Sequence, residues 1–212
     1  MTRAKICGLT TPDGLDAALV GGAAFVGAVF HPASPRNLSP IEAAALFDRA
    51  RGRAKIVAVT VDASDRLLTE IALILRPDLI QLHGSETPER ALEITRLTRA
   101  GVIRALSVKS ADDIERARAF EPVVEHLMFD APAPEGSAIP GGVGARFDGS
   151  VLKGHSFQKP WFLAGGLNPG NVVQAVAASG APLVDVSSGV ERARGVKDPA
   201  LVAAFLAASH AA

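Results

Sequence analysis

The chain has 212 residues, of which 48% are hydrophobic and 21% are charged, so it can bury a full core and falls within the usual size range of one domain. Lys and Arg (22) balance Asp and Glu (22), which excludes the basic surface of a nucleic-acid-binding protein. We find no signal-peptide pattern and no apolar stretch of about 18 residues that would span a membrane. These features predict a cytoplasmic protein with one domain over residues 1–212 and neither nucleic acid nor a membrane as partner.

Short apolar segments alternate along the chain with longer segments of helical periodicity, which is typical of βα units repeated around a parallel sheet. The apolar segments predict eight strands, over Ala4–Cys7, Phe25–Val29, Ile56–Val61, Leu79–Leu82, Val102–Ser107, His126–Phe129, Trp161–Ala164 and Leu183–Val186. The periodic segments predict helices over Pro40–Arg51, Arg66–Leu75, Glu89–Arg99, Ala111–Phe120, Asn171–Ser179 and Ala200–Ala208.

Three prolines indicate where helices begin, because proline suits a first helical turn and a Ser, Thr or Asn before it caps that turn. The pairs are Ser39-Pro40, Thr87-Pro88 and Asn168-Pro169. After the sixth strand, Ala131–Gly144 is rich in Pro, Gly, Ala and Ser and is too long for an ordinary connection. We predict a functional loop there.

Eight alternating strands and helices can close into a barrel or lie as an open doubly wound sheet. An open sheet that binds a dinucleotide carries G-x-G-x-x-G directly after its first strand, whereas the first strand here ends in CGLTTPDG. We therefore predict an α/β fold, a single (β/α)8 TIM barrel of eight parallel strands with surrounding helices.

In a barrel, the loops after the strands meet at one face, so we expect the chemistry at the strand ends. Cys7 ends the first strand and is the only cysteine, which excludes an internal disulfide and a cysteine-rich zinc site. A thiolate there could take a proton, provided that a positive group or a helix end lies nearby. Lys5 cannot be assumed to supply that charge, because the strand register is unproven. Cys7 is thus either a general base or a small core hydrophobe.

Three further strand-end side chains are candidates. A carboxyl group shielded from water holds its proton nearer neutrality, so Asp130, after the sixth strand, is a candidate general acid, the alternative being a residue that caps or organises the loop. Arg36, after the second strand, could bind a substrate carboxylate in a bidentate manner or lie as a surface arginine. His83 is either a substrate contact or a structural histidine.

Glycine and serine residues follow the last three strands, and together they indicate a phosphate site. Glycine lets backbone N–H groups approach an anion, serine adds hydroxyl donors, and a short helix beginning near Ser188 would point its positive end at the site. A phosphate site formed by the loops after strands seven and eight is a recurrent barrel feature. The alternative is that these glycines only make tight turns and caps. The candidates are Gly141, Gly142, Gly144, Gly165, Gly166, Ser187, Ser188 and Gly189.

Seven motifs at these strand ends resemble, in the same order along the whole chain, those of the phosphoribosylanthranilate isomerase family of tryptophan biosynthesis. They are Lys5-Ile6-Cys7-Gly8-Leu9-Thr10; Ser34-Pro35-Arg36; Gln81-Leu82-His83-Gly84 with Glu86; Phe129-Asp130-Ala131; Gly141-Gly142-Val143-Gly144 with Phe147-Asp148; Leu163 to Pro169; and Asp185 to Glu191 with Gly195-Val196-Lys197-Asp198.

The resemblance implies an intramolecular oxidoreductase, an aldose–ketose isomerase, that converts N-(5-phospho-β-D-ribosyl)anthranilate to 1-(2-carboxyphenylamino)-1-deoxy-D-ribulose 5-phosphate by an Amadori rearrangement. By family role, Asp130 is the general acid, Cys7 the general base and Arg36 the ligand of the anthranilate carboxylate. The resemblance also implies that the glycine and serine loops hold the phosphate and that Asp185 contacts the substrate. Acid and base catalysis suffice for this reaction, so we expect no metal and no cofactor.

Two other readings remain open. One is another phosphosugar barrel enzyme, such as an epimerase, which usually depends on metal-binding histidines and carboxylates. Of the five histidines only His31 and His83 fall at strand ends, too few for a convincing metal site. The other is a non-catalytic barrel that binds a phosphorylated ligand, which would not need Cys7 and Asp130. The sequence is compatible with a monomer or a homodimer.

Overall fold

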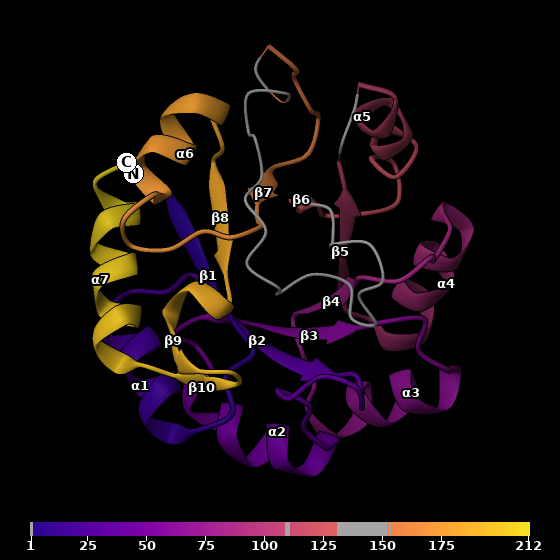
Figure 1. Ribbon diagram of the computed structural model, residues 1–212. Coiled ribbons are helices and arrows are strands. Elements are labelled where there is room, and N and C mark those ends of the chain that lie inside the picture. Colours follow the sequence, from indigo (N-terminus) through magenta and orange to yellow (C-terminus); the bar gives the residue numbers. More distant parts are fainter. Residues whose placement is uncertain (1, 109–110, 131–151, 153) are drawn as a thin grey trace.

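A computed structural model describes residues 2–108, 111–130, 152 and 154–212, and in it eight parallel strands close into a barrel (Figure 1). Each strand pairs with its neighbours in the sequence, and β1 pairs with β8 to close the ring. The strands are β1 (Arg3–Cys7), β2 (Phe25–Phe30), β3 (Lys55–Thr60), β4 (Leu79–Leu82), β5 (Gly101–Ser107), β6 (His126–Asp130), β7 (Trp161–Leu163) and β8 (Leu183–Val186). The predicted barrel is confirmed, with strand bounds within one residue of those expected.

Helices cover the outside of the barrel (Figure 1). They are α1 (Pro12–Val20), α2 (Pro40–Phe47), α3 (Asp65–Ile74), α4 (Pro88–Thr98), α5 (Ala111–Arg118), α6 (Val172–Ser179) and α7 (Pro199–His210). Short 3₁₀ turns follow at Asp48–Ala50 and Ser188–Val190. The strands β9 (Glu191–Ala193) and β10 (Val196–Lys197) form a small hairpin. Helix α1 and this hairpin were not among the predicted elements, and the hairpin strands are too short to show a period in the sequence.

The predicted helix starts hold at two of the three proline positions. The Ser39 and Thr87 hydroxyls accept hydrogen bonds from backbone N–H groups three residues later, and each is followed by a proline in the first turn. The expectation at Asn168 is wrong. Its side-chain oxygen accepts from the N–H of Gly170 in a local turn, and α6 begins only after Asn171. An Asx turn competes with a helix cap for the same side chain, so the sequence pattern fits both.

Two apolar cores lie on opposite faces of the strands. Inward side chains fill the barrel, among them Phe25, Val57, Ile103, Met128 and Phe162. Outward side chains pack under the helices, and this core is larger. Side chains alternate between the two faces of a strand, so a strand buried on both faces reads as a nearly continuous apolar segment. This is the reason the strands are visible in the sequence.

Charged side chains interrupt the apolar filling at the β1–β8 pair, where the ring closes. Lys5 is the register partner of Asp185, and both side chains point inward and are buried. The strands are parallel, so the carboxyl ends of β1, β4, β6 and β8 form one rim. Among the described residues no helix is long and apolar enough to cross a bilayer, and α7, with 12 residues, is the longest of them.

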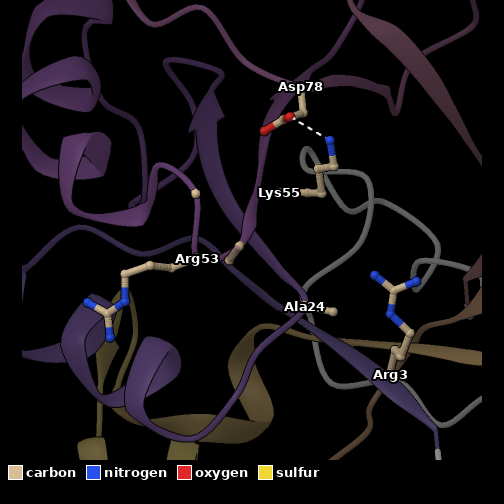
Figure 2. Close-up of a pocket in the computed structure, with 7 residues that line it drawn as sticks. Arg3, Ala24, Arg53, Lys55 and Asp78 are labelled. Atoms are coloured by element: carbon tan, nitrogen blue, oxygen red, sulfur yellow. Dashed lines mark hydrogen bonds and ion pairs between the residues drawn. The ribbon is translucent and has the colours of Figure 1, made fainter.

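The opposite rim, at the amino ends of the strands, carries a polar pocket of about 320 Å³ (Figure 2). Arg3, Arg53 and Lys55 line it, and Lys55 Nζ lies 2.9 Å from Asp78 Oδ1. Barrel enzymes place their chemistry at the carboxyl-end rim, whereas the amino-end rim serves stability. This pocket is therefore remote from the predicted strand-end residues.

Loss of the α2 cap is expected to destabilise the barrel modestly. Ser39 and Glu42 form a capping box in which each side chain accepts a hydrogen bond from the other residue's N–H. Ser39→Ala removes one half of it and should lower the free energy of unfolding by about 1 kcal/mol, whereas Ser39→Asn keeps a capping side chain and should lie near wild type. Urea unfolding measures both, and equal midpoints for wild type and Ser39→Ala would refute the expectation.

Candidate functional site

Cys7 is the last residue of β1 and lies at the carboxyl-end rim with 7% of its surface exposed. Lys5, two residues earlier, shares its inward face. The Lys5 ammonium group is fully buried, and its Nζ donates a hydrogen bond of 2.8 Å to Oδ1 of Asp185 on β8. The register that the sequence left open therefore puts a buried cation on the same face as the thiol.

The surroundings of Cys7 act on its thiol in opposite directions. Burial, the largest influence, raises the pKa of Cys7 above its ordinary value, while the charge of Lys5 lowers it. Burial also lowers the pKa of Lys5, but the charges of Asp185 and Cys7 more than offset this and the pKa of Lys5 is raised overall. Lys5 therefore keeps its proton, and its charge is the strongest influence in favour of the thiolate.

Asp130 ends β6 at the same rim and is 6% exposed. Its Oδ2 lies 3.4 Å from Nε2 of His83, which follows β4. The other ring nitrogen of His83 lies 3.2 Å from the amide nitrogen of Gln81, a group that only donates. In this arrangement Nδ1 of His83 accepts, so Nε2 carries the ring hydrogen. Within the described residues Oδ1 of Asp130 has no hydrogen bond.

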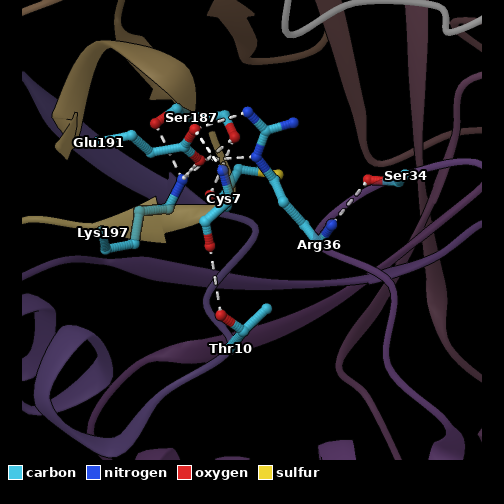
Figure 3. A network of polar contacts seen from close by, with 8 residues as sticks. Cys7, Thr10, Ser34, Arg36, Ser187, Glu191 and Lys197 are labelled. Carbon is cyan, nitrogen blue, oxygen red and sulfur yellow. Dashed lines mark hydrogen bonds and ion pairs between the residues drawn. The ribbon is translucent and has the colours of Figure 1, made fainter. Parts of the chain in front are cut away.

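Arg36 follows β2 and is held by Glu191 of β9 (Figure 3). Its Nε and Nη2 donate to the two carboxylate oxygens of Glu191 at 2.6 and 2.8 Å. A guanidinium group has five N–H donors, so this contact occupies only one edge. On the other edge, Nη1 has no hydrogen bond to any described residue and remains available for a second carboxylate.

Lys197 and Ser187 connect this ion pair to the end of β1 (Figure 3). The Lys197 ammonium group donates to Glu191 Oε1 at 2.7 Å and to the carbonyl and hydroxyl oxygens of Ser187 at 2.9 and 3.2 Å. The Ser187 hydroxyl in turn donates to the carbonyl of Cys7 at 3.2 Å. Burial would raise the pKa of Glu191, but hydrogen bonds and charges from Arg36 and Lys197 lower it to about 2. Glu191 is therefore a permanent carboxylate that orients both cations.

The loops after β7 and β8 lie against each other. Gly165 and Gly166 follow β7 with φ values of 89° and 66°, where glycine is strongly favoured. Ser187 follows β8, and the predicted short helix is present as the 3₁₀ turn that contains Ser188 and Gly189. A Cβ atom on Gly189 would lie 1.8 Å from the carbonyl oxygen of Leu167, so only glycine allows this approach. The predicted residues Gly141, Gly142 and Gly144 and the predicted loop Ala131–Gly144 lie outside the described residues.

A second buried ion pair fixes the loop that carries His83. Arg104 of β5 donates to Glu86 Oε2 at 2.8 Å and to the carbonyl of Gly84 at 3.0 Å. Glu86 also accepts from the backbone N–H groups of Gly84 and Asp62, both at 2.9 Å. The loops after β3 and β4 are therefore held to β5 by one carboxylate.

From the sequence alone Lys5 could not be placed beside Cys7, and five other side chains at this rim had no assigned role: Gln81, Glu86, Arg104, Glu191 and Lys197. Their signal is a charged or amide residue inside an otherwise apolar strand or directly after one, since such a group is rarely buried without a partner. The partners lie up to 180 residues away in the chain, as for Lys5 and Asp185, so the sequence could not pair them. Asp185, expected to contact substrate, is held beneath the rim by Lys5. No three His, Cys, Asp or Glu side chains in the described part of the chain are grouped to hold a metal ion.

Comparisons with known proteins show what this chain is similar to. Residues 4–208 match the sequence profile of the N-(5'phosphoribosyl)anthranilate (PRA) isomerase family. The chain is 59% identical over 207 residues to N-(5'-phosphoribosyl)anthranilate isomerase of Caulobacter sp. (strain K31), with 97% of each chain covered. The phosphoribosyl anthranilate isomerase of Thermotoga maritima superposes with a TM-score of 0.89 at 32% identity over the whole of both chains.

A crystal structure of a phosphoribosyl anthranilate isomerase in complex with reduced 1-(o-carboxyphenylamino)-1-deoxyribulose 5-phosphate superposes with a TM-score of 0.85 at 30% identity, again over all of both chains. The profile match spans nearly the entire barrel, including the strand ends that carry Cys7, Arg36, Asp130 and Asp185. The chain therefore belongs to the N-(5'-phosphoribosyl)anthranilate isomerase family, whose members isomerise phosphoribosylanthranilate in tryptophan biosynthesis.

Proposed function

We propose that Cys7 is the general base and Asp130 the general acid of this chain's reaction, the Amadori rearrangement of N-(5-phospho-β-D-ribosyl)anthranilate to 1-(2-carboxyphenylamino)-1-deoxy-D-ribulose 5-phosphate. One observation carries the proposal: the only thiol of the chain and a buried carboxyl group face inward at one rim of the barrel, at the ends of β1 and β6. Family membership favours this reaction over an epimerase or a non-catalytic barrel.

The reaction needs one proton donated and one removed. Asp130 gives its proton to the ribose ring oxygen as the C1–O bond breaks, and the nitrogen lone pair forms the C1–N double bond, which leaves an open-chain Schiff base with a positively charged nitrogen. The Cys7 thiolate then takes the proton from C2, and the C–H electron pair forms the C1–C2 double bond of an enolamine while the nitrogen becomes neutral. Tautomerisation of the enolamine gives the ketone. Each step is proton transfer by a positioned side chain, which contributes about 10²- to 10⁴-fold in rate.

Arg36 is proposed to hold the anthranilate carboxylate through its free edge. Glu191 occupies Nε and Nη2 and so fixes the plane of the guanidinium group, which leaves Nη1 and the second hydrogen of Nη2 for a carboxylate. The compound bound to the related crystallised enzyme carries such a carboxyphenyl group. Because the arginine is already held in place, ordering it on substrate binding costs less conformational entropy. His83, beside Asp130, is proposed to contact the substrate near the acid.

The phosphate is proposed to bind at the loops after β6, β7 and β8. Among the described residues, Gly165 and Gly166 have positive φ values and no side chain to keep an anion from their backbone N–H groups. Ser187, Ser188 and Gly189 add hydroxyl and amide donors at a short 3₁₀ turn. Gly141, Gly142 and Gly144 are proposed to complete the site from the sequence alone. Asp185, whose side chain is mostly buried, remains a proposed substrate contact.

We further propose that the protein acts in the cytoplasm, as one domain over residues 1–212, without a metal or organic cofactor. Its partner is then the small phosphoribosyl substrate, and it works as a monomer or a homodimer. Restored growth of a tryptophan auxotroph that lacks this isomerase would establish the substrate directly, and failure of the expressed, folded protein to restore growth would contradict the proposal.

Loss of either catalytic group should abolish most of the activity. Cys7→Ser and Asp130→Asn are expected to lower kcat by about 10²- to 10⁴-fold, because each removes one proton transfer and changes little volume. The assay follows the loss of anthranilate-type fluorescence. Asp16→Asn, which changes an exposed carboxylate of α1 paired with Arg49, is the control and should keep full activity. Full activity in both active-site variants would rule out the mechanism.

The close contact between the loops after β7 and β8 should matter for substrate binding more than for turnover. Gly189→Ala places a methyl group against the Leu167 carbonyl and forces the loops apart, so KM is expected to rise about tenfold with kcat little changed. Inhibition by inorganic phosphate should weaken in parallel. Gly170→Ala, in the loop after β7 that also carries Leu167 but without a backbone clash, is the matched control. A normal KM in Gly189→Ala would argue against phosphate binding here.

Glu191 should make stability depend on acid pH. Its pKa is about 2 in the folded chain against an ordinary 4.5, so its stabilising contribution is complete above the ordinary value and falls as the pH drops toward 2. When the pH falls from about 6 to about 3.5, the contribution of Glu191 to the free energy of unfolding should decrease by about 1.4 kcal/mol. Glu191→Gln cannot titrate at this position. Between about pH 6 and about pH 3.5 its free energy of unfolding, measured with urea, should therefore fall by about 1.4 kcal/mol less than that of the wild type. An identical pH dependence for the two proteins would contradict this assignment.

A further inference from the structure

A buried thiol is a poor base unless something stabilises its thiolate. Four charged groups act on Cys7: Lys5 of β1, Asp185 of β8, Lys197 of β10 and Arg36 after β2. Of these, Lys5 and Lys197 favour the thiolate and Asp185 opposes it. The question is which cation carries the effect.

Lys197 and Arg36 are both committed to other acceptors. The three hydrogens of the Lys197 ammonium group meet three acceptors, two on Ser187 and one on Glu191. Arg36 donates two hydrogen bonds to that same carboxylate. The negative charge of Glu191 therefore offsets much of the electrostatic effect that both cations would have on the thiol.

Lys5 is differently placed. Its ammonium group has one carboxylate partner, Asp185 Oδ1 at 2.8 Å, so it keeps hydrogens for a second acceptor. Lys5 and Cys7 also pack on the same point of β2. A Cβ atom built on Gly27 would lie 3.2 Å from Cys7 Sγ and 3.3 Å from Lys5 Cε. The missing side chain of Gly27 thus leaves room for both groups side by side.

We propose that Lys5 is the positioning residue that makes Cys7 a base: its buried ammonium group, anchored by Asp185 and packed with the thiol over Gly27, stabilises the Cys7 thiolate. The inference rests on the proposed role of Cys7 as general base. Lys5 keeps its proton throughout. When the thiolate takes the C2 proton of the substrate, the sulfur becomes neutral and the Lys5 charge remains balanced by Asp185.

The chain is well suited to a direct test, because it has one cysteine and no tyrosine. The ultraviolet absorbance of a thiolate therefore reports Cys7 without interference from tyrosinate. In Lys5→Met, which keeps the length of the side chain but not its charge, the midpoint of the thiolate titration should rise by about one unit or more. At neutral pH kcat should fall about tenfold or more and recover as the pH rises, while KM changes little.

Lys55→Met is the matched control. Lys55 also forms an ion pair, with Asp78, but at the opposite rim, so its loss should leave both the titration and kcat unchanged. Lys5→Met leaves Asp185 buried without its cation and could fail to fold. The double variant Lys5→Met/Asp185→Asn removes both charges and should also show a raised midpoint, by less than Lys5→Met, because the Asp185 charge that opposes the thiolate is lost as well. A wild-type midpoint in whichever of these two proteins folds would overturn the inference.

Cys7→Ser separates this inference from the proposed function. If Cys7→Ser keeps full activity, Cys7 is not the base and the proposed function fails whatever the titration shows. If Cys7→Ser is inactive while the thiolate midpoint in Lys5→Met matches wild type, Cys7 remains the base and only the role of Lys5 is refuted.

Discussion

The pairing of β1 with β8 closes the barrel, and the candidate site depends on it. That pairing puts Lys5 beside Asp185 and brings the Ser187 hydroxyl to the carbonyl of Cys7, although these residues are 180 positions apart in the chain. A parallel barrel gathers all its strand ends at one rim. Closure of the ring therefore brings Cys7, Lys5 and the loop after β8 together at that rim.

Buried ion pairs hold the remaining parts of the rim. Arg36 and Lys197 share Glu191, and Arg104 with Glu86 fixes the loop that carries His83. Such pairs add little net stability, because burial removes the hydration of both charges, but removal of one partner is costly. Their value here is geometric. Each holds a donor or an acceptor in one orientation before substrate arrives, so less ordering is needed on binding.

The two rims of the barrel divide stability from chemistry. At the amino-end rim, Lys55 and Asp78 form a partly exposed pair in an open polar pocket, where solvent screens the charges. At the carboxyl-end rim the charges are buried, and burial alters how readily Cys7 and Glu191 exchange protons. Ion pairs of the same residue types therefore shift the pKa values of buried neighbours at the carboxyl-end rim, whereas at the amino-end rim solvent weakens their effect.

The sequence by itself determined the barrel, because strands buried on both faces read as apolar segments between segments of helical period. Polar residues marked where strands end, such as His83 directly after β4 and Asp130 at the end of β6. The sequence also marked Cys7, Arg36 and the glycines after β7. Local patterns misplaced the cap at Asn168 and missed α1. Only the tertiary structure decided that Lys5 faces the thiol, that Glu191 occupies one edge of Arg36 and that Gln81 contacts His83. These contacts join segments far apart in the chain, and register and ring closure, which no local period encodes, bring them together.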